Sequence, residues 1–289
     1  MDIITNKELN RLRTIIERNR VAFTDVANIQ QLQVGYDVRA DNYDKESQSR
    51  QDKVHQTTLT DRFFLEELRG LISGKGIDYL DVGCADGRRT KRFSNELEDF
   101  CQIDRLNAID YSREMVAQAQ GILGHSNVAW GNITDLPFKA EFNVVTCMYG
   151  VIGHLPEDLI QQAFNNLSQT LVDGGILCID VLERDKKFLK QYRYNEVNGN
   201  HGKYVAYFVK VGGSPLTNGK GQRILYTMLM FTPGEINTYA KNEGLIPIAD
   251  KEIYPVERGV YEMEYAIVLK KSANKSVCSL ACPHSLDHF

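Results

Sequence analysis

The chain has 289 residues, of which 43% are hydrophobic and 25% are charged, the balance of a globular protein that buries a sizeable core. Its formal net charge of −4 argues against a broad basic surface for nucleic acid, and no apolar run reaches the roughly 20 residues of a membrane span. The first residues lack the basic-then-apolar order of a signal peptide, and six cysteines are too few for a disulfide scaffold at this length. We therefore expect a cytoplasmic protein, built as one large domain or as a domain with an accessory piece.

Three helices are predicted ahead of the first strand, because apolar residues recur at helical spacing over residues 7–20, 26–34 and 59–71. An aromatic and acidic stretch, residues 35–45, separates the second helix from the third and contains Tyr36 and Tyr43. Taken by itself, this stretch has the composition of a polar linker whose tyrosines pack on the neighbouring helices.

An apolar run over residues 77–82 predicts a short buried strand, and the glycine-containing turn at residues 83–87 connects it to a helix. Strand, glycine turn and helix form a nucleotide-type site, because backbone without Cβ atoms can approach a ligand closely. The spacing argues against phosphate capture: Ala85 and Arg88 occupy the second and third glycine positions of a dinucleotide fingerprint, and no P-loop ending follows. The carboxylate of Asp81 beside a neutral turn suits a zwitterionic ligand, although Asp81 can also be read as a residue that caps the turn.

The second predicted strand, residues 106–110, ends in a carboxylate. Asp110 follows the glycine turn by one helix and one strand, where an α/β fold places a carboxylate for ribose hydroxyls. A carboxylate can accept two hydrogen bonds from a vicinal diol, and the alternative is a simple turn residue. Ser112 is predicted to be the N-cap of the next helix. A third short strand then begins near Asn127, and its loop contains Asn132.

A fourth buried strand begins at Phe142, and the loop at residues 148–154 is expected at the carboxyl end of the sheet, where ligands bind in open α/β folds. His154 is placed to act as a base near neutral pH, or its ring braces the loop or the start of the following helix. That helix is predicted over residues 159–171, ending at an Asp-Gly-Gly stop, and a fifth strand over residues 176–181. The alternation implies a parallel sheet with right-handed crossovers.

The composition becomes rich in β-formers and turn residues over residues 183–231, which predicts an inserted antiparallel hairpin. Thr232-Pro-Gly-Glu then starts a helix, and a second hairpin is predicted from residues 245–254 and 261–269. The tail, residues 272–289, carries four soft-to-borderline metal ligands, Cys278, Cys282, His284 and His288. Their spacing matches no zinc module, and the surrounding composition is typical of a flexible end, so no metal site is predicted.

The sequence from Asp81 to Gly87 resembles motif I of the class I S-adenosylmethionine-dependent methyltransferases, usually Asp/Glu-x-Gly-x-Gly-x-Gly. Asp81, Gly83 and Gly87 match this motif, and Ala85 replaces the middle glycine. The resemblance covers residues 76–271. It includes the Asp-Leu-Pro-Phe at residues 135–138, preceded by Asn132 where an acid is usual. A segment resembling motif IV follows, with Asn143 in place of aspartate.

This resemblance implies an α/β, Rossmann-like class I methyltransferase fold. The sheet would be mostly parallel and seven-stranded, with strand order 3-2-1-4-5-7-6 and a terminal antiparallel hairpin. Residues 1–58 would form an N-terminal helical lid and residues 59–271 the methyltransferase domain. Residues 183–231 would be an inserted β-hairpin cap over the substrate, and residues 272–289 a flexible tail.

The resemblance also implies S-adenosyl-L-methionine as cofactor and S-adenosyl-L-homocysteine as product. The turn backbone would pack on the methionine part of the cofactor, Asp81 would help to hold its ammonium group, and Tyr43, with Tyr36 second, would cover the sulfonium. The implied cofactor-binding residues are Tyr43, Asp81, Gly83, Ala85, Gly87, Asp110, Tyr111, Met115, Asn132, Ile133 and Met148. Among these, Tyr111 and Met115 would pack on the adenine, and the amide oxygen of Asn132 would accept from its amino group.

The expected activity is transfer of a methyl group to a nitrogen or oxygen of a small-molecule substrate, by in-line displacement at the sulfonium methyl carbon. A base is optional in such a reaction, and His154 and Tyr149 are the candidates. Two other functions are compatible with the fold: methylation of tRNA or protein, against which the acidic balance counts, and a non-catalytic cofactor-binding partner subunit.

Overall fold

The computed structural model describes residues 36–37, 40, 56–184, 204–208, 210–211, 214–215, 225–253 and 264–273. Several predictions concern residues outside this set: the helices at 7–20 and 26–34, Tyr43, the turn between the last two strands, and the Cys/His ligands of the tail. Within the described residues, no helix is long and apolar enough to cross a membrane.

Seven strands form one sheet with the order β10-β11-β5-β4-β1-β2-β3, which is the predicted order 3-2-1-4-5-7-6 read from the other edge. The strands are β1 (Gly76–Val82), β2 (Gln102–Asp110), β3 (Val128–Trp130), β4 (Phe142–Cys147), β5 (Leu171–Leu182), β10 (Leu245–Ile253) and β11 (Glu264–Lys271). β1 to β5 pair in parallel, whereas β11 is antiparallel to both β5 and β10. The predicted class I architecture is confirmed.

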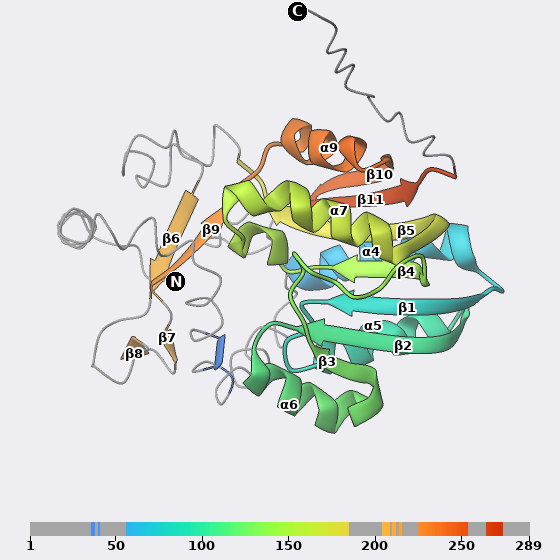
Figure 1. Ribbon diagram of the computed structural model, residues 1–289, viewed down its shortest axis with the longest axis horizontal. Helices are drawn as coiled ribbons and strands as arrows, with labels where there is room; N and C mark the ends of the chain where they lie inside the picture. The colour runs from blue at the N-terminus through green and yellow to red at the C-terminus, as the bar shows by residue number, and fades with distance from the viewer. Residues whose placement is uncertain are drawn as a thin grey trace, which may run out of the picture.

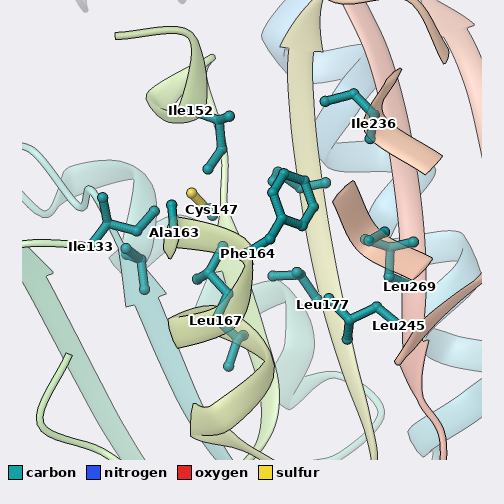
Figure 2. Close-up of a cluster of buried hydrophobic side chains, with 14 of the residues drawn as sticks. Ile133, Cys147, Ile152, Ala163, Phe164, Leu167, Leu177, Ile236, Leu245 and Leu269 are labelled. Atoms are coloured by element: carbon teal, nitrogen blue, oxygen red, sulfur yellow. The ribbon is translucent and has the colours of Figure 1, made fainter. Parts of the chain in front are cut away.

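Helices cover both faces of the sheet (Figure 1). They are α4 (Gln56–Ile72), α5 (Arg88–Glu98), α6 (Arg113–Leu123), α7 (Ile160–Thr170) and α9 (Pro233–Asn242). One core cluster joins the sheet to α7 and α9, a second joins it to α4 and α5, and a third joins it to α6. Figure 2 shows the first cluster around Phe164, whose ring is fully buried. Burying each such side chain contributes about 1.5–3 kcal/mol, so this cluster stabilises the packing of α7 and α9 on the sheet.

The starts of two helices follow from their capping residues. Ser112 accepts the N–H of Met115 at 3.1 Å through its side chain and is the N-cap of α6, as predicted. Thr232 and Glu235 form a capping box at the start of α9, with Pro233 at its first position.

The predicted helix stop at Asp-Gly-Gly is wrong. β5 already begins at Leu171, five positions before the predicted start at Ile176, and the glycines lie inside it. Leu171 pairs with Phe142 across an irregular register, and Lys271 Nζ donates to the Leu171 carbonyl at 2.7 Å. Tertiary pairing thus outweighs the local stop signal, because Gly174 adopts a φ of 77° within the strand without steric strain.

The inserted segment contains the expected antiparallel pair, β6 (Tyr204–Phe208) with β9 (Leu225–Leu229), and a short second pair, β7 (Lys210–Val211) with β8 (Ser214–Pro215). β6 and β9 lie beyond the carboxyl ends of the parallel strands (Figure 1). β9 contacts the 3-10 turn η2 (Val151–His154), which follows β4.

Candidate active site

The glycine turn after β1 has a left-handed backbone at three positions, with φ of 82° at Gly83, 48° at Ala85 and 81° at Gly87. A Cβ on Gly83 would lie 2.5 Å from Val151 Cγ2, and one on Gly87 would lie 3.0 Å from Ala119 Cβ. The turn is therefore enclosed between η2 and α6, and only glycine fits at these two positions. Ala85 tolerates its conformation, at about 1–2 kcal/mol for a left-handed residue, because its N–H is bonded to Asp110.

Asp110, the last residue of β2, is half-buried beside this turn. Its Oδ2 accepts the N–H of Ala85 and its Oδ1 accepts the N–H of Ser112, both at 2.8 Å. Each oxygen keeps a further lone pair, so the carboxylate can still accept two hydroxyl groups from a diol. Burial raises the pKa of Asp110 to about 6, against the opposing effect of the backbone N–H groups of Ser112, Ala85 and Tyr111. The geometry fits the ribose-binding role predicted from its spacing.

This pKa predicts that affinity for S-adenosylhomocysteine decreases in mild acid. Hydroxyl donors favour the charged carboxylate, so affinity should be constant above pH 6 and should fall by about tenfold per pH unit below it. Calorimetric titration between pH 5 and pH 8 measures this.

Protonation of Asp110 does not unfold the protein, so this loss of affinity in acid would not come from Asp110-linked unfolding. Its folded-state pKa is raised, so the folded chain binds more protons than the unfolded chain between about pH 4 and 6, and Asp110 makes folding more favourable as the pH falls through this window. A thermal melt at each pH provides the control, and equal affinity at pH 5 and pH 8 would contradict the assignment.

Two residues of the N-terminal segment contact the loops on either side of β1. The hydroxyl oxygen of Tyr36 lies 3.0 Å from Nε2 of His154, and the two rings meet edge to face at 5.6 Å. Asp37 Oδ1 accepts the hydroxyl of Ser112 at 2.5 Å. Tyr36 thus contacts the loop after β4, and Asp37 contacts the loop after β2. Because β1 lies between β4 and β2 in the sheet, these two residues lie near the carboxyl end of β1, where the glycine turn is.

A buried carboxylate holds the loop after β4. Tyr149 and Gly150 are consecutive left-handed residues, with φ of 65° and 68°. Their N–H groups donate to the two oxygens of Asp180 on β5, at 2.9 and 2.6 Å. Asp180 is 1% exposed, and burial raises its pKa. These bonds stabilise a conformation that is unfavourable for tyrosine, so Asp180 fixes the beginning of the segment that leads to His154.

The ring of Tyr149 lies beside a cluster of charges from α4 and α5. The guanidinium of Arg89 is 4.1 Å from the ring centroid, and Arg92 is 3.5 Å from the hydroxyl oxygen. Asp61 accepts from Arg89 at 3.2 Å and from Arg92 at 2.7 Å. Burial opposes the charge of Arg89, but Asp61 more than compensates, so the pKa of this guanidinium is raised.

Asp81 lies inside the protein, at 1% exposure. Its oxygens accept the hydroxyls of Thr90 at 2.5 Å and Thr146 at 2.6 Å, and the Thr146 hydroxyl lies 2.8 Å from that of Tyr79. Since the Thr146 proton is used by Asp81, Tyr79 donates to Thr146, and burial raises the pKa of Tyr79. The carboxylate thus connects β1, α5 and β4, and its predicted contact with a cofactor ammonium group stays a prediction.

The remaining predicted residues lie at or beside the same edge of the sheet. Asn132 follows β3, and its Oδ1 accepts the N–H of Thr134 at 3.0 Å, which leaves one lone pair for an adenine amino group. Ile133, Met115 and Met148 are buried, at 6%, 0% and 1% exposure. Their predicted contacts with the cofactor also stay predictions.

The sequence pattern does not identify the roles of several polar residues. Asn143 is the second residue of β4, and its Oδ1 accepts the N–H of Asp78 at 2.8 Å, so it braces the amino-end half of β1. Asp180, Thr146 and Asp61 form the networks described above. The sequence feature that could have identified such residues is a polar residue within an otherwise apolar strand, as Asp180 is in residues 176–181.

Comparison with known proteins finds methyltransferases that are similar to this chain. Residues 80–175 match a family model described as a methyltransferase domain. A solved S-adenosylmethionine-dependent methyltransferase from Clostridium acetobutylicum ATCC 824 is 16% identical, with a TM-score of 0.53 over 80% of this chain and 99% of that one. No curated protein matches the sequence.

Two structures with bound ligands are similar in fold. A structure described as a DhpI-SAM-HEP complex is 20% identical, with a TM-score of 0.56 over 83% of this chain and 96% of that one. The 1,6-didemethyltoxoflavin-N1-methyltransferase of Burkholderia thailandensis, with 1,6-didemethyltoxoflavin and S-adenosylhomocysteine bound, is 17% identical. Its TM-score is 0.54 over 86% of this chain and 90% of that one. At sequence identities this low, the similarity to these proteins shows a shared fold only.

Proposed function

We propose that this chain is an S-adenosylmethionine-dependent methyltransferase that acts on a nitrogen or oxygen of a small molecule. Its fold is that of the class I methyltransferases, and residues 80–175 match the family model of a methyltransferase domain. The cofactor supplies an electrophilic methyl group on a sulfonium. The protein therefore has to hold two reactants in line and exclude water from between them. We assign residues 59–271 to the methyltransferase domain, with residues 1–58 as lid and 183–231 as substrate cap.

The residues at the carboxyl edge of the sheet fit this cofactor. Gly83 and Gly87 let the turn pack closely against Val151 and Ala119, and we assign the backbone of this turn to the methionine part of the cofactor. Asp110 keeps a lone pair on each oxygen for the ribose hydroxyls. Asn132 would accept from the adenine amino group, and Tyr111 would face the ring.

The observation that supports an acceptor site most directly is the hydrogen bond between Tyr36 and His154, 3.0 Å long. It brings a phenol to the imidazole at the end of η2, whose first residue, Val151, borders the glycine turn. A neutral imidazole can take the proton of an acceptor hydroxyl, whereas an amine needs only to arrive uncharged. We assign this role to His154, because the hydroxyl of Tyr149 lies beside Arg92 instead.

A small-molecule acceptor agrees with the acidic balance of the chain, which has a formal net charge of −4. The fold is also used for such acceptors, as in the Burkholderia thailandensis structure that contains 1,6-didemethyltoxoflavin. The aromatic and partly cationic composition of the inserted segment suits a small polar or acidic substrate.

Binding of S-adenosylhomocysteine is the first expected result. Calorimetric titration of the full chain should give a dissociation constant in the micromolar range, with no binding of NAD, because the turn lacks the glycines of a dinucleotide site. Absence of S-adenosylhomocysteine binding would refute the proposed function.

Replacing His154 with alanine should leave the affinity for S-adenosylhomocysteine unchanged and reduce turnover by about a hundredfold or more, the usual contribution of a general base. Turnover is measured with the acceptor found by screening small amines and alcohols against labelled cofactor. Tyr149→Phe is the matched control, since it keeps the ring beside Arg89 and should retain activity. Unchanged turnover in His154→Ala would exclude the base role.

A further inference from the structure

Trp130 is the single tryptophan of the chain and the last residue of β3. Its side chain is 43% exposed, which makes it one of the few large apolar residues at the surface among those described. The strand register pairs it with Asp110, the predicted ribose-binding carboxylate, and Gly131 donates its N–H to the Asp110 carbonyl at 3.0 Å. An exposed indole at the edge of a ligand site calls for a functional explanation.

Three contacts connect Trp130 to the bend that follows Asp110. Its indole N–H donates to the carbonyl of Tyr111 at 2.7 Å. Its ring stacks on the ring of Tyr111, with centroids 5.6 Å apart and 29° between the planes. The guanidinium of Arg113 lies 4.7 Å from the indole centroid. Trp130 thus holds both the backbone and the side chain of Tyr111.

The contacts of Trp130 affect nucleoside binding because Tyr111 directly follows Asp110 in the chain. A ribose bound by Asp110 carries its base next to the carboxylate, and the adjacent residue, Tyr111, offers a half-buried aromatic surface. If the Tyr111 ring faced only solvent, it would rotate freely in the unbound protein. Ligand binding would then restrict this rotation, and the lost entropy would lower the affinity. Stacking on Trp130 restricts the ring beforehand, and the bond to the Tyr111 carbonyl fixes the backbone between Asp110 and Ser112.

We propose that Trp130 is a positioning residue for the nucleoside half of the cofactor: it orients Tyr111 toward the purine and keeps the Asp110 bend in place for the ribose. The inference rests on the proposed function, because it assumes an adenosyl ligand at Asp110. It assigns to an edge-strand residue a part of the binding affinity that the glycine turn and Asp110 do not provide.

The test measures S-adenosylhomocysteine and adenosine binding by calorimetry in Trp130→Phe and Trp130→Ala. Trp130→Phe keeps a ring but loses the N–H bond, and should weaken both ligands by about threefold. Trp130→Ala also loses the stack and should weaken both by about tenfold or more. Equal factors for the two ligands are expected, since they share only the adenosyl half. In the wild type, titration with S-adenosylhomocysteine should also change the emission of Trp130.

Ile246→Ala is the matched control, because Ile246 is 54% exposed on β10 at the opposite edge of the sheet and should not affect binding. A merely structural role for Trp130 would lower the melting temperature and leave the affinity of the folded protein unchanged, which would overturn the inference. So would weaker binding of S-adenosylhomocysteine with unchanged binding of adenosine. If the wild type itself fails to bind S-adenosylhomocysteine, the proposed function fails, and this inference fails with it.

Discussion

Asp110→Ala is expected to weaken S-adenosylhomocysteine binding by about a hundredfold or more. The carboxylate would accept two ribose hydroxyls, and hydrogen bonds to a charged group are each worth about 1.5–3 kcal/mol, where about 1.4 kcal/mol corresponds to a factor of ten. The substitution also removes the acceptors of the Ala85 and Ser112 N–H groups, so the glycine turn and the start of α6 lose a shared support. Calorimetric titration measures the affinity directly.

Two further variants make this result specific. Asp110→Asn keeps the size and one acceptor oxygen, and should lose about tenfold. Asp135→Ala removes an exposed carboxylate from the loop after the next strand, and should bind like the wild type. Equal affinity in Asp110→Ala and the wild type would show that the ribose is held elsewhere.

The fold could be predicted from the sequence because its signals are local. Apolar runs, the Ser112 cap, the capping box at Thr232 and the glycines of the turn each act within a few residues, and strand–helix alternation limits the topology to a small number of arrangements. The place of Asp110 at the end of β2 could be predicted for the same reason, since it depends on one helix and one strand of ordinary length, and its ribose-binding role stays a prediction. The α7–β5 boundary could not, because pairing with β4 and β11 decides it.

The partners of the site residues could not be predicted, because they come from elements distant in the chain. Tyr36 and His154 are separated by 118 positions, and the Gly150 N–H and Asp180 by 30. Which side chains meet depends on how the helices and loops pack on the sheet, and no local pattern encodes it. Tyr149 illustrates the point: its sequence position is compatible with a catalytic phenol, but its left-handed backbone and the Asp180 bonds direct its ring to Arg89.

Asp61→Asn is expected to lower the free energy of unfolding by about 3 kcal/mol or more, the cost of breaking a buried ion pair from one side. The side chains of Asp61 and Arg89 are 7% and 12% exposed, so the arginine would keep its charge in a site with little water. Asn cannot replace the charge, although its shape is the same. Urea denaturation measures the change, with the slope against denaturant checked for constancy.

Asp78→Asn, on β1, is the matched control, because it removes the same charge from an exposed ion pair. Asp78 pairs with Arg105 at 3.3 Å, but the two side chains are 35% and 40% exposed, and such a pair is worth less than about 1 kcal/mol. Equal losses in the two variants would contradict the assignment of a buried ionic support to Asp61. A larger loss for Asp61→Asn would instead indicate that α4 and α5 are held together by the same charges that position Tyr149. The stability of this face of the sheet and the geometry of the loop after β4 would then depend on one carboxylate.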